Sequence, residues 1–314
     1  MPIPAPIFPA GRCGIAETPP EQLGPSVLAA WDAFLDVVTA PTTDLGRPSR
    51  LPGWSGKDVC VHLGAWPESR IVDSLLASAR EGGTGTSAGP DAANEALVAA
   101  HRDAPVDEVL RSLVEARRSL AAFFASPEAR ELGRAQARST VGPLPVSCLL
   151  NAGTFELAVH ALDLAPCGAP PPPPVLLDRG LSALLDITGA LANRAGVDLE
   201  LGAQTPHGGW SFVSGPQGWL TRPLAAGTLS GVGVDGSAVD LLEAAAGRAS
   251  LAQLLLTRRL VVHQLPQWMR LAPLLDDVPG LPGGAALKGA VGSVSGLAGG
   301  LAGGVGRVLG RLRR

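Results

Sequence analysis

A run of five consecutive prolines, Pro170 to Pro174, constrains the fold of this chain more than any other feature. Consecutive prolines adopt an extended polyproline helix, and they can continue neither an α-helix nor a central β-strand. We therefore predict a stiff linker at residues 169–174. A chain of 314 residues is long enough for two domains, so the linker is expected to separate two independently built parts.

The part before the linker has the apolar spacing of helices. Apolar residues recur every three or four positions in residues 22–40, 106–125 and 146–165, which predicts three amphipathic helices. Ser55 followed by Asp58 forms the pattern of a capping box and predicts the start of another helix. The segment EGGTGTSAGPDAAN is interpreted as a loop. Four such helices predict a four-helix bundle over residues 20–168.

The part after the linker has a different pattern. A helix is predicted at residues 176–194, and short segments bounded by glycine, proline or aspartate follow it, which is typical of strands in an antiparallel sheet. The segment GSAVDLLEAAAG again has helical spacing. Residues 175–278 are therefore predicted to form a small α+β domain. The expected strands are VDLEL, GGWSFVS, GWLTRPL and GTLSGVGV.

The two ends of the chain are expected to lie outside these domains. Residues 1–19 are rich in proline and are interpreted as a flexible or strapped-down lead-in without a secretory signal. Residues 279–314 are rich in glycine, contain no acidic residue and end in several arginines. We interpret them as a flexible tail, and a weak contact with a membrane surface is the alternative.

Charge and cysteine usage narrow the class of protein. The net charge is only −3, whereas a nucleic-acid-binding domain usually carries a basic surface, so no nucleic-acid partner is expected. The four cysteines form no CxxC pair, and the chain is too long to be a small disulfide-rich scaffold. A reduced, cytoplasmic setting is therefore predicted.

The segment FELAVHALDLA contains carboxylate and imidazole side chains in a predicted helix that is otherwise apolar. Glu156 and His160 are four residues apart, so both project from one face of the predicted helix. His62 is predicted to point inward from the helix that follows Ser55. Two imidazoles and a carboxylate are the ligand set of many catalytic zinc sites. Asp163 is expected either to orient an imidazole or to have a surface or capping role. A hydrogen-bonded core cluster without metal is the alternative.

Two motifs together resemble a known family. The sequence LPGWSGKDVCVHLGAW around His62 and the later Glu156, His160 and Asp163 are similar to the DinB-like metal-binding bundle of the mycothiol-dependent maleylpyruvate isomerase family. The resemblance extends over roughly residues 20–275, because the small sterol-carrier-like domain of that family matches in its order of elements. It also matches in the pair Gly247 and Arg248.

The resemblance implies a cofactor and a reaction. It implies that His62, Glu156 and His160 hold a divalent metal, most often zinc, and that mycothiol binds at the open position. A metal-bound thiol is deprotonated and is then nucleophilic. In an isomerase of this kind the thiolate adds to an activated cis double bond, the resulting single bond rotates, and elimination gives the trans product. A transferase of the family keeps the conjugate.

The same resemblance implies residues for an anionic substrate, such as an unsaturated dicarboxylic acid. Arg248 is the first candidate, because an arginine of the family's second domain lies near the metal, and Arg222 is the second. An arginine can hold a carboxylate in two hydrogen bonds, although a solvated surface role is the alternative for both. Trp54 and Trp66 are candidate walls of the cofactor site, with core packing as their alternative.

A non-catalytic function competes with the enzyme. In that hypothesis the metal only stabilises the bundle, and the second domain shelters an apolar ligand or docks a protein partner.

Overall fold

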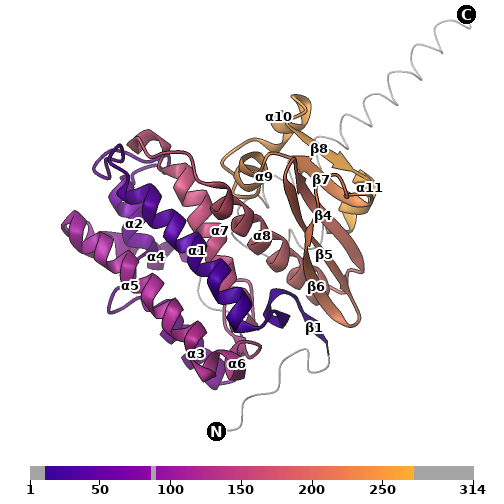
Figure 1. Cartoon of the computed structure of the whole chain (residues 1–314), viewed down its shortest axis with the longest axis horizontal. Helices are drawn as coiled ribbons and strands as arrows, with labels where there is room; N and C mark the ends of the chain where they lie inside the picture. Colours follow the sequence, from indigo (N-terminus) through magenta and orange to yellow (C-terminus); the bar gives the residue numbers. More distant parts are fainter. Residues whose placement is uncertain (1–10, 86–89, 272–314) are drawn as a thin grey trace, which may run out of the picture.

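The computed structural model describes residues 11–85 and 90–271 of the chain, and Figure 1 shows how the elements are arranged. Helices gather on one side of the molecule and a six-stranded sheet on the other. One long helix, α8 (Pro174–Arg194), lies between them and packs against both. The chain is thus mixed α and β, with a helical N-terminal region and a C-terminal region that contains the sheet.

The four helices expected before the proline run are present. They are α1 (Pro20–Thr39), α2 (Gly56–Leu63), α5 (Val106–Ala125) and α7 (Val146–Asp163). Helix α1 packs against α5 and α7, and α2 packs against α5. Ser55 and Asp58 form the predicted capping box at the start of α2.

Three further helices lie among these four in the described residues. They are α3 (Ile71–Arg80), α4 (Pro90–His101) and α6 (Pro127–Leu132), and a small hairpin of β2 (Gln136–Ala137) and β3 (Leu144–Pro145) precedes α7. The interpretation of EGGTGTSAGPDAAN as a loop was wrong at its end, because α4 begins at Pro90. A proline is well placed at the first position of a helix, and burial of Leu97 and Val98 stabilises α4.

The sheet is mixed rather than antiparallel. Its order is β1-β6-β5-β4-β7-β8, and β4 pairs with β7 in parallel while β4, β5 and β6 are antiparallel. The parallel pairing of β4 with β7 arises because the segment after β6 crosses the sheet before β7. The strands are β1 (Arg12–Cys13), β4 (Leu199–Thr205), β5 (Gly208–Gly215), β6 (Gly218–Leu224), β7 (Val232–Gly236) and β8 (Leu260–His263).

Short helices accompany the last strands. Helix α9 (Ala238–Ala245) confirms the helical spacing of GSAVDLLEAAAG, and α10 (Leu251–Leu256) and α11 (Leu265–Trp268) lie on either side of β8. Three short 3-10 helices, η1 (Gly14–Glu17), η2 (Ala165–Cys167) and η3 (Met269–Leu271), complete the assignment.

Helix α8 joins the two regions through close backbone contacts. A Cβ atom on Gly180 would lie 2.7 Å from the Cβ of Ala158 in α7, and one on Gly189 would lie 2.9 Å from the Cβ of Phe212 in β5. Both distances are too short for real side chains, so the absence of a side chain lets α8 approach α7 and the sheet. The proline run is therefore followed by a helix that returns to the helical region.

The lead-in is strapped down where the structure describes it. Strand β1 pairs in parallel with β6, and the amide of Ile15 donates a 2.9 Å hydrogen bond to Asp186 of α8. Ile15 is only 5% exposed. Residues 11–19 thus belong to the packed structure, so a flexible lead-in was the wrong description for them.

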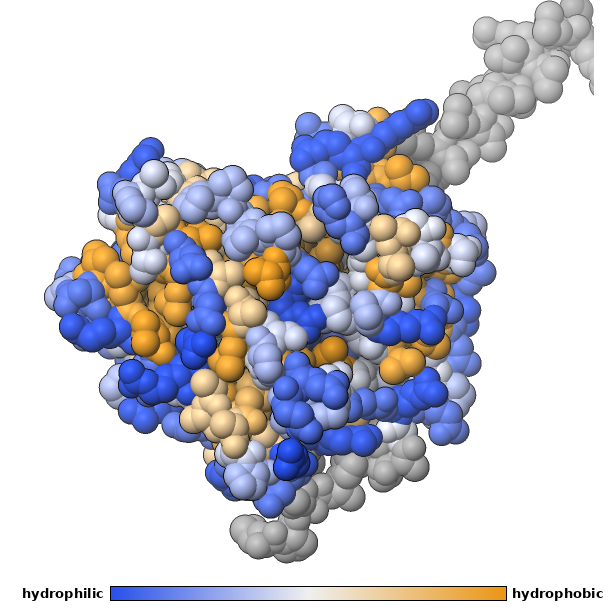
Figure 2. All heavy atoms as spheres, viewed as in Figure 1, coloured by the Kyte–Doolittle hydropathy of each residue, from blue (hydrophilic) through white to orange (hydrophobic). Residues whose placement is uncertain are grey.

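The surface seen in Figure 2 mixes hydrophilic and hydrophobic residues, with hydrophobic groups most visible over the helical region at the left. Within the described residues, we find no helix with both the length and the apolar character needed to cross a bilayer. The tail at residues 279–314, for which a membrane contact was the alternative prediction, lies outside the described residues.

Candidate metal centre

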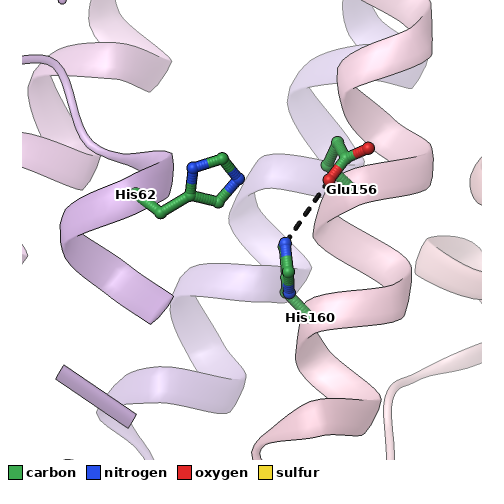
Figure 3. Close-up of side chains that lie close together, drawn as sticks. All are labelled: His62, Glu156 and His160. Atoms are coloured by element: carbon green, nitrogen blue, oxygen red, sulfur yellow. Dashed lines mark ion pairs between the residues drawn. The ribbon is translucent and has the colours of Figure 1, made fainter. Parts of the chain in front are cut away.

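Three side chains meet between α2 and α7. His62 projects from α2, and Glu156 and His160 project from one face of α7 toward it, as Figure 3 shows. One potential ligand atom from each residue lies within 4.8 Å of the others. His160 Nε2 is 3.4 Å from Glu156 Oε2. The convergence predicted from the sequence is therefore observed.

The three residues differ in their access to solvent. The His160 side chain is 7% exposed, whereas the Glu156 side chain is 48% exposed. Trp54 lies beside His62, with 5.7 Å between ring centroids. The group is therefore most exposed to solvent at Glu156, whereas His160 is buried.

Asp163 fixes the orientation of His160. The carboxylate is fully buried and lies 3.0 Å from His160 Nδ1, which leaves Nε2 turned toward Glu156. Burial opposes the charge on the imidazole, but hydrogen bonds to Asp163 and Glu156 outweigh it and raise the pKa of His160 to about 9. Without a metal ion His160 is therefore protonated on both ring nitrogens, with Nδ1 facing Asp163 and Nε2 facing Glu156.

His62 has the opposite electrostatic setting. Burial, with His160 as the second cause, lowers the pKa of His62 to about 4. A neutral imidazole with a free lone pair is the form that binds metals. Burial opposes ionisation of Glu156, but the hydrogen bond from His160 and the nearby positive charges lower its pKa. The group thus combines a neutral imidazole, an ionised carboxylate and a proton that a cation can displace.

This donor set fits a divalent metal ion. Two imidazoles and one carboxylate fill three positions of a tetrahedral zinc site and leave the fourth for water or substrate. Because a metal must displace the Nε2 proton of His160, its binding would release a proton. The Asp163 hydrogen bond at Nδ1 is compatible with that exchange, since it uses the other ring nitrogen.

Arg248 reaches this group from the C-terminal region. Its Nε donates to Asp163 Oδ1 and its Nη2 to Asp163 Oδ2, both at 3.1 Å. Burial opposes ionisation of Asp163, but the hydrogen bonds from His160 and Arg248 lower its pKa. Arg248 follows α9, where Gly247 adopts a positive φ of 67°. The predicted nearness of Arg248 to the histidines is thus observed through Asp163.

A second arginine at this boundary was not predicted from the sequence. Arg50 lies in the segment before α2 and pairs with Glu243 of α9, and its amide donates to the Asp163 carbonyl at 2.9 Å. Arg50 is one of many arginines in the sequence, so no spacing rule distinguishes it. Two ion pairs, Arg50 with Glu243 and Arg248 with Asp163, therefore join the two regions beside the metal group.

Arg222 is not brought to the histidines, which corrects the expectation for this residue. Thr221 of β6 donates a 2.6 Å hydrogen bond to Asp186 of α8, so Thr221 faces α8. Side chains alternate along a strand, and Arg222 consequently points to the opposite face of the sheet. There it pairs with Glu200 at 2.5 Å.

Trp66 is also displaced from the group. Helix α2 ends at Leu63, so the helical face expected to carry Trp66 does not extend that far. The indole donates to the Val61 carbonyl at 2.8 Å and stacks on His101, with 3.7 Å between centroids. His101 in turn pairs with Glu68 at 2.5 Å. Trp66 therefore has the packing role that was its alternative interpretation.

Comparisons with known proteins agree with the motifs. Residues 27–165 match the family model described as the mycothiol maleylpyruvate isomerase N-terminal domain. This helical region is therefore similar to that domain family. All three residues of the candidate metal group, together with Asp163, lie inside the matched segment.

Two solved structures are similar to the chain. One is the crystal structure of the mycothiol-dependent maleylpyruvate isomerase, with 20% identity, a TM-score of 0.49, and coverage of 76% of this chain and 94% of that chain. The other is a histidine-to-alanine mutant of that isomerase, with 20% identity, a TM-score of 0.47, and coverage of 76% and 93%. The comparison with curated proteins gave no match.

Proposed function

We propose that this protein is a zinc- and mycothiol-dependent enzyme of the maleylpyruvate isomerase type. In this proposal residues 20–168 act as a DinB-like four-helix bundle with added short helices, and residues 175–278 act as a sterol-carrier-like α+β domain. The observation that carries the proposal is the meeting of His62, Glu156 and His160 within 4.8 Å, with the Glu156 side chain half exposed.

The residues of the site have distinct roles in this proposal. His62 and His160 hold the metal through ring nitrogens, and Glu156 supplies the third ligand at the solvent side. Asp163 keeps His160 in one tautomer through the hydrogen bond at Nδ1. A bound divalent cation would lower the pKa of the mycothiol thiol, so that the nucleophilic thiolate is present at neutral pH. Trp54 forms a wall beside His62.

Arg248 is proposed to bind an anionic substrate. It is 28% exposed, carries a fixed positive charge and acts on Glu156 electrostatically, so it lies beside the metal group. An unsaturated acid held there by its carboxylate would present its double bond to the thiolate. Isomerisation requires that the thiolate leave again, whereas a transferase would keep the conjugate.

Metal content tests the first part of the proposal. Protein purified without added zinc is expected to contain about one divalent metal per chain in the wild type and almost none in His160→Ala or His62→Ala. His207→Ala is the matched control, because His207 lies in an exposed turn between β4 and β5. Equal metal content in all four proteins would contradict the metal site.

Thiol-dependent turnover tests the second part. The wild type is expected to convert a cis-enoic acid to its trans isomer only when mycothiol is present, and Arg248→Ala is expected to raise KM for an anionic substrate. Accumulation of a stable thioether would identify a transferase. Metal binding without any thiol-dependent chemistry would favour the alternative, a metal-stabilised binding module.

A reducing cytoplasmic setting is part of the proposal. All four cysteines are buried as free thiols, and a thiol cofactor needs a compartment in which thiols stay reduced. The expected partners are thus the low-molecular-weight thiol and a small-molecule substrate.

A further inference from the structure

The two histidines of the metal group differ in what supports them. His160 Nδ1 has the Asp163 carboxylate at 3.0 Å. His62 Nδ1 is buried, and it has no hydrogen-bond partner among the residues that the structure describes. A histidine that binds a metal through one nitrogen usually donates the proton on its other nitrogen to an acceptor. Of the two histidines, only His160 therefore has an acceptor at Nδ1 among the described residues.

Figure 3 shows which nitrogen of His62 is available. One ring nitrogen points toward Glu156 and His160, and the other points away from them. If the first nitrogen binds a metal, the second must carry the proton, because a neutral imidazole has only one. A buried N–H donor without an acceptor is unfavourable, so an acceptor at this position would favour metal binding.

Helix α4 is the element that brings a polar side chain to His62. It packs against α2, and its inward stripe consists of Asn94, Leu97, Val98 and His101, at the i, i+3, i+4 and i+7 positions of one helical face. Leu97 and Val98 are 9% and 1% exposed, which fixes the direction of this face. Asn94 is half-buried at its N-terminal end, and its side chain interacts with the His62 ring.

The C-terminal end of α4 is anchored to the segments around α2. His101 stacks on Trp66 and pairs with Glu68, and Lys57 of α2 donates to the Ala104 carbonyl at 3.0 Å. These contacts hold α4 against α2 near its last turn. Because these contacts fix the helix, they also fix the position of Asn94, which lies two turns before His101.

We propose that Asn94 is the positioning residue for His62, accepting the Nδ1 proton through its amide oxygen when a metal is bound. The proposal rests on the proposed metal site and adds the residue that orients its second imidazole. An amide is a neutral acceptor, so Asn94 would orient His62 without adding negative charge, in contrast to Asp163. Helix α4 would then complete the metal group.

Metal affinity of three variants tests this proposal. Zn²⁺ affinity is measured by competition with a chromophoric chelator, and Co²⁺ absorption reports the coordination geometry. Asn94→Ala is expected to weaken Zn²⁺ binding by roughly 10- to 100-fold. Asn94→Asp keeps an acceptor and is expected to bind close to the wild type or more tightly. Glu95→Ala, an exposed neighbour on the same helix, is the control and is expected to leave affinity unchanged.

Thermal unfolding of the metal-free proteins separates orientation from packing. A residue that only packs α4 would lower the unfolding temperature without metal, and Asp would not rescue it. Wild-type affinity in Asn94→Ala, or equal weakening in Asn94→Ala and Asn94→Asp, would overturn the role of Asn94 and leave the metal site standing. A wild type that binds no metal would overturn both proposals.

Discussion

Two fully buried aspartates show how the same side chain serves different purposes in the two regions. Asp163 lies beside the metal group and receives charged donors, since Arg248 donates to it and a protonated His160 faces it. Among the described residues, Asp186 of α8 receives neutral donors, which include the Ile15 amide, the Trp219 indole and the Thr221 hydroxyl. Both carboxylates are 0% exposed.

The two environments move the pKa in opposite directions. Positive partners outweigh burial at Asp163 and lower its pKa, whereas burial dominates at Asp186 and raises its pKa despite the hydrogen bonds from neutral groups. Hydrogen bonds from neutral groups compensate a buried carboxylate only partly, and cations compensate it more fully. Asp163 therefore connects the two regions and orients His160, while Asp186 joins the lead-in, α8 and the sheet.

The largest loss of stability is expected from substitution of Asp163. Asp163→Ala leaves the Arg248 guanidinium and the His160 imidazole without their acceptor, and it is expected to lower the free energy of unfolding by about 3–5 kcal/mol. Urea denaturation of metal-free protein measures this, and Asp163→Asn, which keeps an oxygen acceptor, should lose less. A loss below about 1 kcal/mol would show that the two regions do not depend on this pair.

A smaller loss of stability is expected when Asp186 loses one of its neutral hydrogen-bond donors. Thr221→Val keeps the shape of the side chain but removes the hydroxyl that donates to Asp186, and it is expected to cost about 1.5–3 kcal/mol because the acceptor is a buried carboxyl group. Thr228→Val is the control, since its hydroxyl bonds to the Ala225 carbonyl at an exposed site. A similar loss of stability in Thr221→Val and Thr228→Val would show that the hydrogen bond to Asp186 contributes no more than one at an exposed site.

The pH dependence of stability isolates the charge on Asp186. Its pKa is raised in the folded state, so its contribution to stability is fully present below the unfolded value of 3.8 and declines as pH rises through the folded value. Asp186→Asn lacks this decline. The stability of the wild type relative to the variant is therefore expected to fall as pH is raised from 4 toward neutrality. A flat or rising difference would contradict the direction of the shift.

The smallest effect is expected on the outer face of the sheet. Arg222 and Glu200 are about half exposed, so Arg222→Ala is expected to change stability by no more than about 1 kcal/mol and to leave metal affinity unchanged. Denaturation and chelator competition measure the two quantities. A drop in metal affinity would mean that Arg222 acts on the histidines, contrary to its place in the sheet.

Much of the helical region could be predicted because its information is local. The spacing of apolar residues located α1, α5 and α7, and the capping box located the start of α2. The four-residue step between Glu156 and His160 placed both on one face, which holds for any α-helix. Helix α4 was missed because a glycine-rich segment precedes it, and its stability comes from burial of Leu97 and Val98.

The C-terminal region was less predictable because its information is not local. Segment boundaries marked the strands, but the parallel pairing of β4 and β7 depends on how the chain crosses the sheet. The face that Arg222 occupies depends on strand register, since a shift of one residue would turn it to the other face.

The sequence by itself determined the helices that carry His62, Glu156 and His160, because hydrogen bonding and side-chain periodicity within a helix depend on neighbouring residues. Only the tertiary structure decided that Arg248 rather than Arg222 approaches Asp163, that Trp66 supports α4, and that Asn94 lies on the face next to His62. Those relations join residues distant in sequence, and the close packing of α8 against α7 and the sheet, together with that of α4 against α2, establishes them.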